Sequence, residues 1–260
     1  MISSDFRAEA RRKLDGKWGK VVLSVLAYLA IFILLGFIKG LFDENSFMNS
    51  LISLGTTVIE IPATFGLVIS LLKVYKGENS DAFDFLSLGF SNFGKSWGIT
   101  FNVILKLIVP IILSIVASAM MLYAFFSTFA VSVLSLPVTS ISSSFTLSAV
   151  TGANMVLLVV GFIIFVVAQI LLSAQSYYYK LAYVLAADNS SLTSKDAVEK
   201  SKELMTGKRG KLFCLELSFI GWAILASLAF GIGYLWLLPY IQFATFAFYF
   251  FVSGKTEATK

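Results

Sequence analysis

Three of the polar side chains within long apolar runs of the sequence could serve chemistry inside a membrane: Glu60, Lys106 and Gln169. Polar groups at membrane depth are rare and mark ion or substrate pathways, so these three form a candidate intramembrane polar site. Glu60 lies 13 positions before Lys73, and Lys106 lies nine positions after Trp97. If both runs are helical, the two groups lie about 20 Å and about 14 Å from the same membrane boundary.

These heights leave two arrangements open. Glu60 and Lys106 could form a buried ion pair between neighbouring helices, because the difference in height is within reach of their side chains. Alternatively, Glu60 faces the outer interface and Lys106 extends towards the inner one. Gln169 either lines a cavity or bonds a neighbouring helix.

A glycine–lysine pair recurs in the stretches "LDGKWGK" at 14–20, "NFGKSWG" at 92–98 and "MTGKRGK" at 205–211. The motif residues are Gly16, Lys17, Gly94, Lys95, Gly207, Lys208 and Arg209. A nucleotide phosphate loop needs glycine, any four residues, then Gly-Lys-Ser/Thr. Here Arg209 follows Lys208, and Lys202 occupies the position of the first glycine. The pattern therefore predicts membrane boundaries, where glycine lets the chain turn and lysine reaches acidic headgroups, and no nucleotide site.

The composition excludes most soluble and enzymatic classes. Of the 260 residues, 58% are hydrophobic and 13% are charged, whereas ordinary soluble domains carry about a quarter charged residues. A chain this apolar cannot bury its surface in one water-soluble core, so we predict a polytopic membrane protein. There is no histidine and one cysteine, Cys214, which removes the commonest metal ligand and any intrachain disulfide. We therefore expect no metal, no cofactor and no enzymatic activity.

Six apolar runs are long enough to cross about 30 Å of hydrocarbon. We place them near residues 19–42, 51–74, 97–126, 152–185, 212–233 and 235–253. The predicted fold is all-α, a polytopic membrane helical bundle of six transmembrane helices in three hairpins, each preceded by a cytoplasmic interfacial amphipathic helix. Residues 1–260 would form one integral membrane domain, with interfacial segments at 1–18, 78–96 and 190–211 and hairpins at 19–74, 97–185 and 212–253.

The segments before the first and third motif copies have helical periodicity. Phe6, Ala10 and Leu14 recur at every fourth position and share one helix face. Before the third copy the shared face consists of Ala197, Val198, Ser201, Leu204 and Met205. Thr193 is placed to cap that helix at its N-terminus, and Gly207 is placed to end it.

Basic residues gather in alternate loops. Six lie before or at the start of the first run, two lie between the second and third, six lie between the fourth and fifth, and two follow the sixth. By the positive-inside rule both termini are cytoplasmic, and an even number of spans leads to the same topology. The net charge of +5 comes without any nucleic-acid recognition motif, so we expect no nucleic-acid partner.

The stretch "SKELMTGKRGKLF" at 201–213, followed by "LSFIGW" and "GIGYLW", resembles the C-terminal half of a bacterial family catalogued as domain of unknown function 975. "ARRKLDGKWGK" at 10–20 and "TFGLVISLLKVYKGE" at 64–78 are similar to other recurring stretches of that family. The resemblance implies a multi-pass protein of the bacterial cell membrane, mostly in Gram-positive species. It implies no accepted activity and supplies no catalytic residues.

Two functions fit these features. In the first, a non-enzymatic envelope protein binds anionic lipid headgroups or a partner membrane protein through its basic cytoplasmic face. In the alternative, a transporter or lipid-handling protein uses the polar site at Glu60, Lys106 and Gln169. A polar pocket at membrane depth containing Glu60 or Lys106 would favour the alternative.

Overall fold

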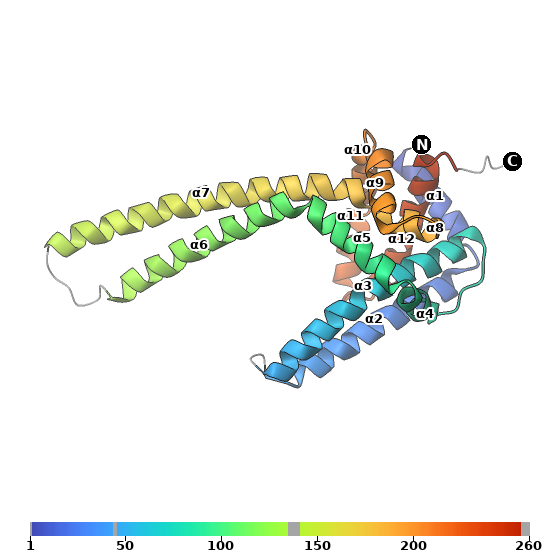
Figure 1. Cartoon of the computed structure of the whole chain (residues 1–260), viewed down its shortest axis with the longest axis horizontal. Coiled ribbons are helices and arrows are strands. Elements are labelled where there is room, and N and C mark those ends of the chain that lie inside the picture. The colour runs from blue at the N-terminus through green and yellow to red at the C-terminus, as the bar shows by residue number, and fades with distance from the viewer. Residues whose placement is uncertain (1, 44–45, 135–140, 256–260) are drawn as a thin grey trace. The chain divides into compact units, whose positions relative to one another are not determined.

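The computed structural model describes residues 2–43, 46–134 and 141–255, and the regular elements in these ranges are α-helices (Figure 1). They are α1 Ser3–Leu14, α2 Trp18–Gly40, α3 Phe47–Lys76, α4 Asp84–Ser91, α5 Phe93–Lys106, α6 Ile108–Leu134, α7 Ile141–Tyr179, α8 Ala182–Asp188, α9 Ser194–Met205, α10 Arg209–Leu217, α11 Ile220–Leu228 and α12 Tyr234–Val252. The predicted all-α fold is confirmed.

Six helical segments within the described ranges are long and apolar enough to cross a membrane. They are Trp18–Gly40, Phe47–Lys76, Ile108–Ala130, Thr151–Asp188, Arg209–Leu228 and Tyr234–Val252. The predicted multi-pass helical membrane protein is therefore confirmed.

The third span begins later than the sequence suggested. We placed it at 97–126, but the helix over this stretch is interrupted at Leu107, between α5 and α6. Pro110 explains the interruption, because its ring has no N–H and clashes with the carbonyl of the residue four positions earlier, Lys106. The spanning segment is consequently Ile108–Ala130.

The fifth span, predicted as one run over 212–233, is divided between α10 and α11. At the division the Ser218 hydroxyl donates to the Leu215 carbonyl, a local bond that competes with regular helical bonding. The Ser218 carbonyl accepts a hydrogen bond from the Arg7 guanidinium at 3.3 Å. The N-terminal helix is thereby attached to the middle of this span.

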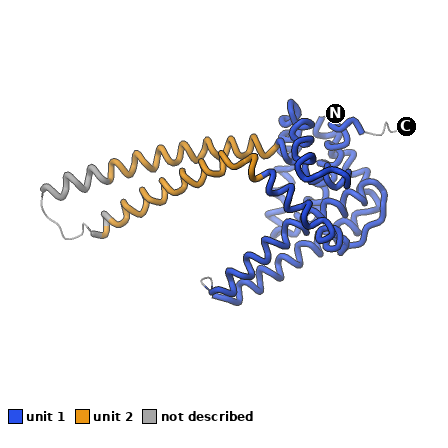
Figure 2. Tube along the Cα trace, viewed as in Figure 1, with its two compact units in different colours: residues 1–103, 178–260 blue, residues 104–177 orange. Residues whose placement is uncertain are grey.

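The helices form two compact units (Figure 2). The first unit contains residues 1–103 and 178–260, and the second contains residues 104–177. Because two distant parts of the chain build the first unit, its stability depends on long-range packing.

α12 is the central helix of the first unit and contacts α1, α2, α3, α10 and α11. Several of its aromatic side chains are fully buried: Phe243, Phe246, Phe248 and Tyr249. Phe6 of α1 packs edge-on against Phe248, with ring centroids 5.5 Å apart. Tyr75 of α3 stacks on Phe250, with centroids 5.4 Å apart. Such aromatic pairs bury large apolar areas in fixed geometries, so α12 sets the positions of the helices around it.

α1 has the apolar face predicted from its periodicity, and this face contacts protein. Phe6, Ala10 and Leu14 are buried where α1 packs along α12. α9 buries the equivalent face through Ala197, Val198, Ser201 and Met205. The hydroxyl of Thr193 caps α9 as predicted, accepting a bond from the Asp196 amide at 3.2 Å. Because the first unit covers these apolar faces, they are not free to insert into a lipid surface.

α4 lies in the segment predicted at 78–96 and crosses α3 at backbone contact. A Cβ atom on Gly66 of α3 would lie 1.9 Å from the Phe85 carbonyl oxygen. A Cβ atom on Gly89 of α4 would lie 2.3 Å from the Pro62 carbonyl oxygen. Only glycine permits this approach, so the two glycines hold α4 against α3.

The second unit is a pair of long helices, α6 and α7, that lie side by side (Figure 1). A Cβ atom on Gly161 would lie 3.0 Å from Met121, which shows how closely the helices approach. Three alanines of this unit are fully buried: Ala117, Ala124 and Ala168. Small residues at such contacts are typical of helix pairs in membranes, where close packing replaces the hydrophobic effect.

Asp188 joins three helix ends within the first unit, although its side chain is only 5% exposed. The carboxylate accepts bonds from Lys76 at the end of α3 and from the Tyr249 hydroxyl of α12, each at 2.7 Å. It also pairs with Lys255, which follows α12. A buried carboxylate is tolerated only when its lone pairs are satisfied, and these three donors satisfy it.

Replacing this carboxylate by an amide should destabilise the first unit. Asp188→Asn leaves two lysines facing a neutral group, and we expect the free energy of unfolding to fall by about 3 kcal/mol. The measurement is an SDS titration in mixed micelles followed by tryptophan fluorescence. Glu203→Gln removes one negative charge from an exposed position on α9 and should change the free energy by less than about 0.5 kcal/mol. Equal losses in the two variants would contradict a specific role for Asp188.

Candidate functional site

The first and third glycine–lysine motifs fold into the same turn. The glycine is left-handed in both, with φ of 69° at Gly16 and 74° at Gly207. In the first copy the Lys17 amide donates to the Leu14 carbonyl at 2.9 Å, and the equivalent bond closes the third copy at 3.0 Å. An extended residue precedes each glycine, which completes a type II turn. The turn ends one helix and allows the next to start in a new direction.

The first lysine of each turn donates a hydrogen bond from its ammonium group to a backbone carbonyl at the end of a helix. Lys17 Nζ lies 3.0 Å from the Val74 carbonyl oxygen in the last turn of α3. Lys208 Nζ lies 3.1 Å from the Val252 carbonyl oxygen at the end of α12. The last carbonyls of a helix lack donors within the helix and carry partial negative charge. Each lysine therefore joins the start of one candidate span to the end of the following one.

The middle copy keeps the lysine contact without the turn. Lys95 Nζ donates to the carbonyls of Ala186, Asn189 and Ser190, at 3.2, 3.4 and 3.0 Å, around the end of α8. Partial burial lowers the pKa of this ammonium group from its ordinary value. Gly94, by contrast, lies within α5 and has a negative φ. The three copies thus share a helix-capping lysine, and only the outer two share a glycine turn.

We expected these lysines to reach acidic headgroups, but their described bonds go to backbone carbonyls of the protein itself. Arg209, the remaining motif residue, places its guanidinium 4.0 Å from the centroid of the Tyr178 ring. A cation over an aromatic face is attracted by the ring quadrupole. The motif lysines therefore have a structural role, and the position of the motif at a membrane boundary stays a prediction.

The second lysine of the outer copies has a different environment. Lys20 and Lys211 are exposed, each at the third position of its helix, α2 or α10. Lys20 Nζ lies 3.5 Å from the Asn79 amide oxygen, and Lys211 Nζ lies 5.5 Å from the centroid of the Phe251 ring. Neither ammonium group forms an ion pair among the described residues, and both lie at the start of a candidate span.

The three polar residues proposed from the sequence are divided between the two units. Glu60 is exposed on α3 of the first unit, and Lys106 is exposed at the end of α5 in the second. Their pairing stays a prediction. Gln169 is half-buried in the second unit, where its amide donates to the Ser114 hydroxyl of α6 at 3.2 Å.

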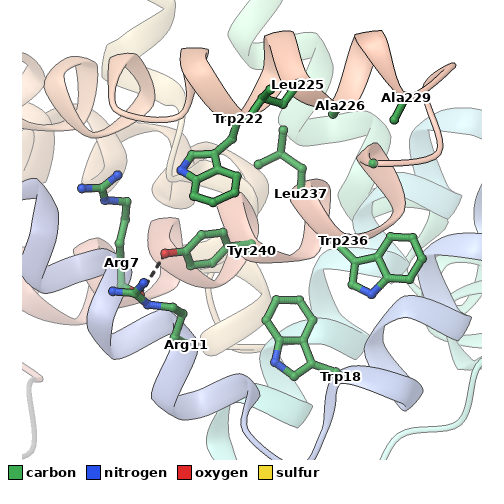
Figure 3. Close-up of a pocket in the computed structure, with 11 residues that line it drawn as sticks. Arg7, Arg11, Trp18, Trp222, Leu225, Ala226, Ala229, Trp236, Leu237 and Tyr240 are labelled. Carbon is green, nitrogen blue, oxygen red and sulfur yellow. Dashed lines mark hydrogen bonds between the residues drawn. The ribbon is translucent and has the colours of Figure 1, made fainter.

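A cavity of about 480 Å³ lies in the first unit, bounded by α1, α2, α11 and α12 (Figure 3). Its lining residues are Arg7, Arg11, Trp18, Trp222, Leu225, Ala226, Ala229, Gly233, Trp236, Leu237 and Tyr240. The arginines lie at one end, and Ala229 and Trp236 lie towards the other (Figure 3). Both cations are therefore separated from most of the apolar wall.

The polar atoms of this cavity are only partly bonded. Arg7 donates to the Ser218 carbonyl, but its buried Nε has no hydrogen-bond partner among the described residues. The Tyr240 hydroxyl donates to the Arg7 backbone carbonyl at 3.4 Å, which holds α1 beside α12. Arg11 is exposed, one helical turn after Arg7. The cavity can therefore supply further N–H donors to a ligand.

Sequence reasoning missed this cavity. Arg7 and Arg11 served only as part of a count of basic residues, and Trp18 entered only as a letter of the first glycine–lysine stretch. The opposite wall, Trp222 to Tyr240, lies more than 200 residues further along the chain. The one local signal was the spacing of the arginines, four apart beside the apolar face of α1.

Comparison with known proteins gives one family and no closer relative. A family model described as "Protein of unknown function (DUF975)" matches residues 1–256. No curated protein and no solved structure matches the chain.

The glycine turns yield a prediction with a control inside the motif. A Cβ atom added at Gly16, Gly207 or Gly94 would meet nothing within 4 Å, so substitution tests backbone conformation alone. Gly16→Ala and Gly207→Ala should each lower the free energy of unfolding by about 1 kcal/mol, because an L-residue resists the left-handed region. Gly94→Ala should be neutral or raise stability by up to about 1 kcal/mol, because Gly94 is helical. The same SDS titration measures all three, and a loss at Gly94 equal to that at Gly16 would contradict the assigned turns.

Proposed function

The chain belongs to the DUF975 family of proteins of unknown function, and we propose that it is a non-enzymatic membrane protein whose basic face binds anionic lipid. With its six apolar helices the chain is a multi-pass membrane protein. The proposed location is the bacterial cell membrane, with both termini in the cytoplasm, because the basic loops alternate with loops nearly free of lysine and arginine.

The observation that carries the proposal is a difference in environment between the two lysines of each outer motif copy. Lys17 and Lys208 are directed to helix carbonyls, whereas Lys20 and Lys211 are exposed at the start of α2 and α10. The start of a span lies at the level of lipid headgroups. A basic residue there gains about 1 kcal/mol from an anionic surface. We assign Lys20 and Lys211 to headgroup contact.

The third amphipathic helix contributes little to such a surface. α9 carries three lysines and three carboxylates, so its formal charges cancel: Lys195, Lys200, Lys202, Asp196, Glu199 and Glu203. On α1, Arg12 is paired with Glu9. We therefore assign the general headgroup contact to the starts of α2 and α10, a narrower basic face than the sequence suggested.

A non-enzymatic role is proposed because the chain has no histidine and a single cysteine, so general acid–base and thiol chemistry lack their usual groups. The alternative, transport or lipid handling through Glu60, Lys106 and Gln169, loses support at one point. Gln169 is engaged with Ser114 within the α6–α7 pair, which is the role of a residue that bonds neighbouring helices. Another membrane protein is a second candidate partner for the same exposed lysines. Their position at the start of a span favours lipid headgroups over a protein.

The test measures lipid preference in the reconstituted full chain. Nanodiscs of mixed phosphatidylglycerol and phosphatidylcholine should show phosphatidylglycerol enriched around the protein, and Lys20→Gln/Lys211→Gln should reduce this enrichment. With about 1 kcal/mol at each site, occupancy of each contact should fall about fivefold. Enrichment is read by mass spectrometry of the lipids retained on partial delipidation, at low and high salt.

The matched control is Lys200→Gln/Lys202→Gln, which removes the same charge from exposed positions of α9. This control should keep the enrichment of the wild type. The proposal is wrong if both double variants lose enrichment equally, or if neither does.

A further inference from the structure

We propose that the cavity between α1, α2, α11 and α12 binds one anionic phospholipid, with its phosphate at Arg7 and Arg11 and an acyl chain along the wall formed by α11 and α12. This inference rests on the proposed interaction with anionic lipid and names a single saturable site for it. The site differs from the general contact at Lys20 and Lys211.

The two cations at the charged end of the cavity have no carboxylate partner within the described residues. Among the described residues, neither Arg7 nor Arg11 forms an ion pair, whereas the neighbouring Arg12 pairs with Glu9. Arginine stays protonated in proteins, and its planar fork of N–H donors matches the oxygens of a phosphate. Side chains four apart on a helix are neighbours, so Arg7 and Arg11 can hold one phosphate group between them.

The position of Arg7 strengthens the need for an anion. It is bonded to the carbonyl of Ser218, between α10 and α11. A buried guanidinium N–H without an acceptor is costly, and an anion would supply that acceptor. A lipid phosphate drawn in beside α1 would satisfy both the charge and the unbonded, buried Nε of Arg7.

The rest of the cavity is shaped for hydrocarbon. From Trp222 to Ala229 the α11 wall extends about 10 Å along the helix. Ala226, Ala229 and Gly233 leave room between the larger side chains, while Leu237 forms a buried apolar surface. A volume of about 480 Å³ lies within the range of small-molecule sites. Cations at one end and an apolar wall beyond them match the two chemical parts of a lipid.

The cavity is also accessible from the direction that a lipid would use. Trp222 and Trp236 line it and remain 56% and 50% exposed. Both belong to candidate spans, so their exposed faces are directed to lipid when the protein is in a membrane. Indole rings suit such a position, because they have an apolar body and an N–H that can bond a headgroup. A soluble phosphate compound would gain nothing from this wall.

The experiment uses the intrinsic fluorescence of the full chain. Three of its four tryptophans line the cavity: Trp18, Trp222 and Trp236. The purified protein in zwitterionic detergent is titrated with phosphatidylglycerol whose acyl chains are brominated, since bromine quenches indoles at contact. The wild type should be quenched saturably, and brominated phosphatidylcholine should require about tenfold more lipid for the same quenching.

Arg7→Gln/Arg11→Gln should weaken phosphatidylglycerol binding at least about tenfold, because two charged donors are lost. Arg11→Gln alone serves as a second variant, since Arg11 is exposed and makes no described bond whose loss would harm folding; a severalfold weakening is expected. Arg12→Gln is the matched control on the same helix and should change the affinity less than about twofold, because its exposed pair with Glu9 contributes little.

Each opposing result has a distinct meaning. Quenching that is unchanged in both the double variant and Arg11→Gln would overturn the site, while the general lipid contact would still be judged by the Lys20 and Lys211 variants. Equal quenching by brominated phosphatidylcholine would overturn the requirement for an anion. Displacement of the brominated lipid by glycerol 3-phosphate or inorganic phosphate alone would show a soluble phosphate site and overturn the assignment to a lipid.

Discussion

The carbonyls at the ends of three helices are the constraint on which the first unit depends. A helix cannot bond its own last four carbonyls, and near a membrane these groups need donors from the protein. Lys17, Lys95 and Lys208 supply such donors at α3, α8 and α12. Each lysine precedes an apolar segment of the chain and bonds the helix end at which a later segment returns. The same contact recurs in all three copies, whereas the glycine turn does not.

These helix ends also meet in space, which concentrates negative charge. Lys76 at the end of α3 and Lys255 after α12 both pair with Asp188 at the end of α8. Helix C-termini carry partial negative charge, so bringing them together around a carboxylate requires several cations. Many of the basic residues that indicate orientation by the positive-inside rule therefore have structural partners. Lys20 and Lys211 are exposed and form no ion pair among the described residues, which is why the proposed lipid contact is assigned to them.

The sequence was informative where structure depends on local properties. The length of an apolar run predicts a span, and a threonine before a periodic segment predicts a cap, so six spans and Thr193 were predicted correctly. The break before Pro110 follows from a local rule, but a span predicted from apolar length alone ran through it. The acceptors of the motif lysines could not be predicted, because they are backbone carbonyls that any sequence provides. The cavity could not be predicted either, because its walls come together only when α1 packs against α12.

A comparison of the outer copies separates structural residues from candidate functional ones. Aligned on the glycine of each turn, the buried Phe6, Ala10 and Leu14 of α1 correspond to the buried Ala197, Ser201 and Met205 of α9. The first lysine caps a helix in both copies. Arg7 has no such counterpart, because Val198 occupies its position and is buried. A residue required by the shared fold would have a similar partner in the other copy. Arg7 therefore answers a requirement that only the first copy has, and its two described environments there are the Ser218 carbonyl and the cavity beside α1.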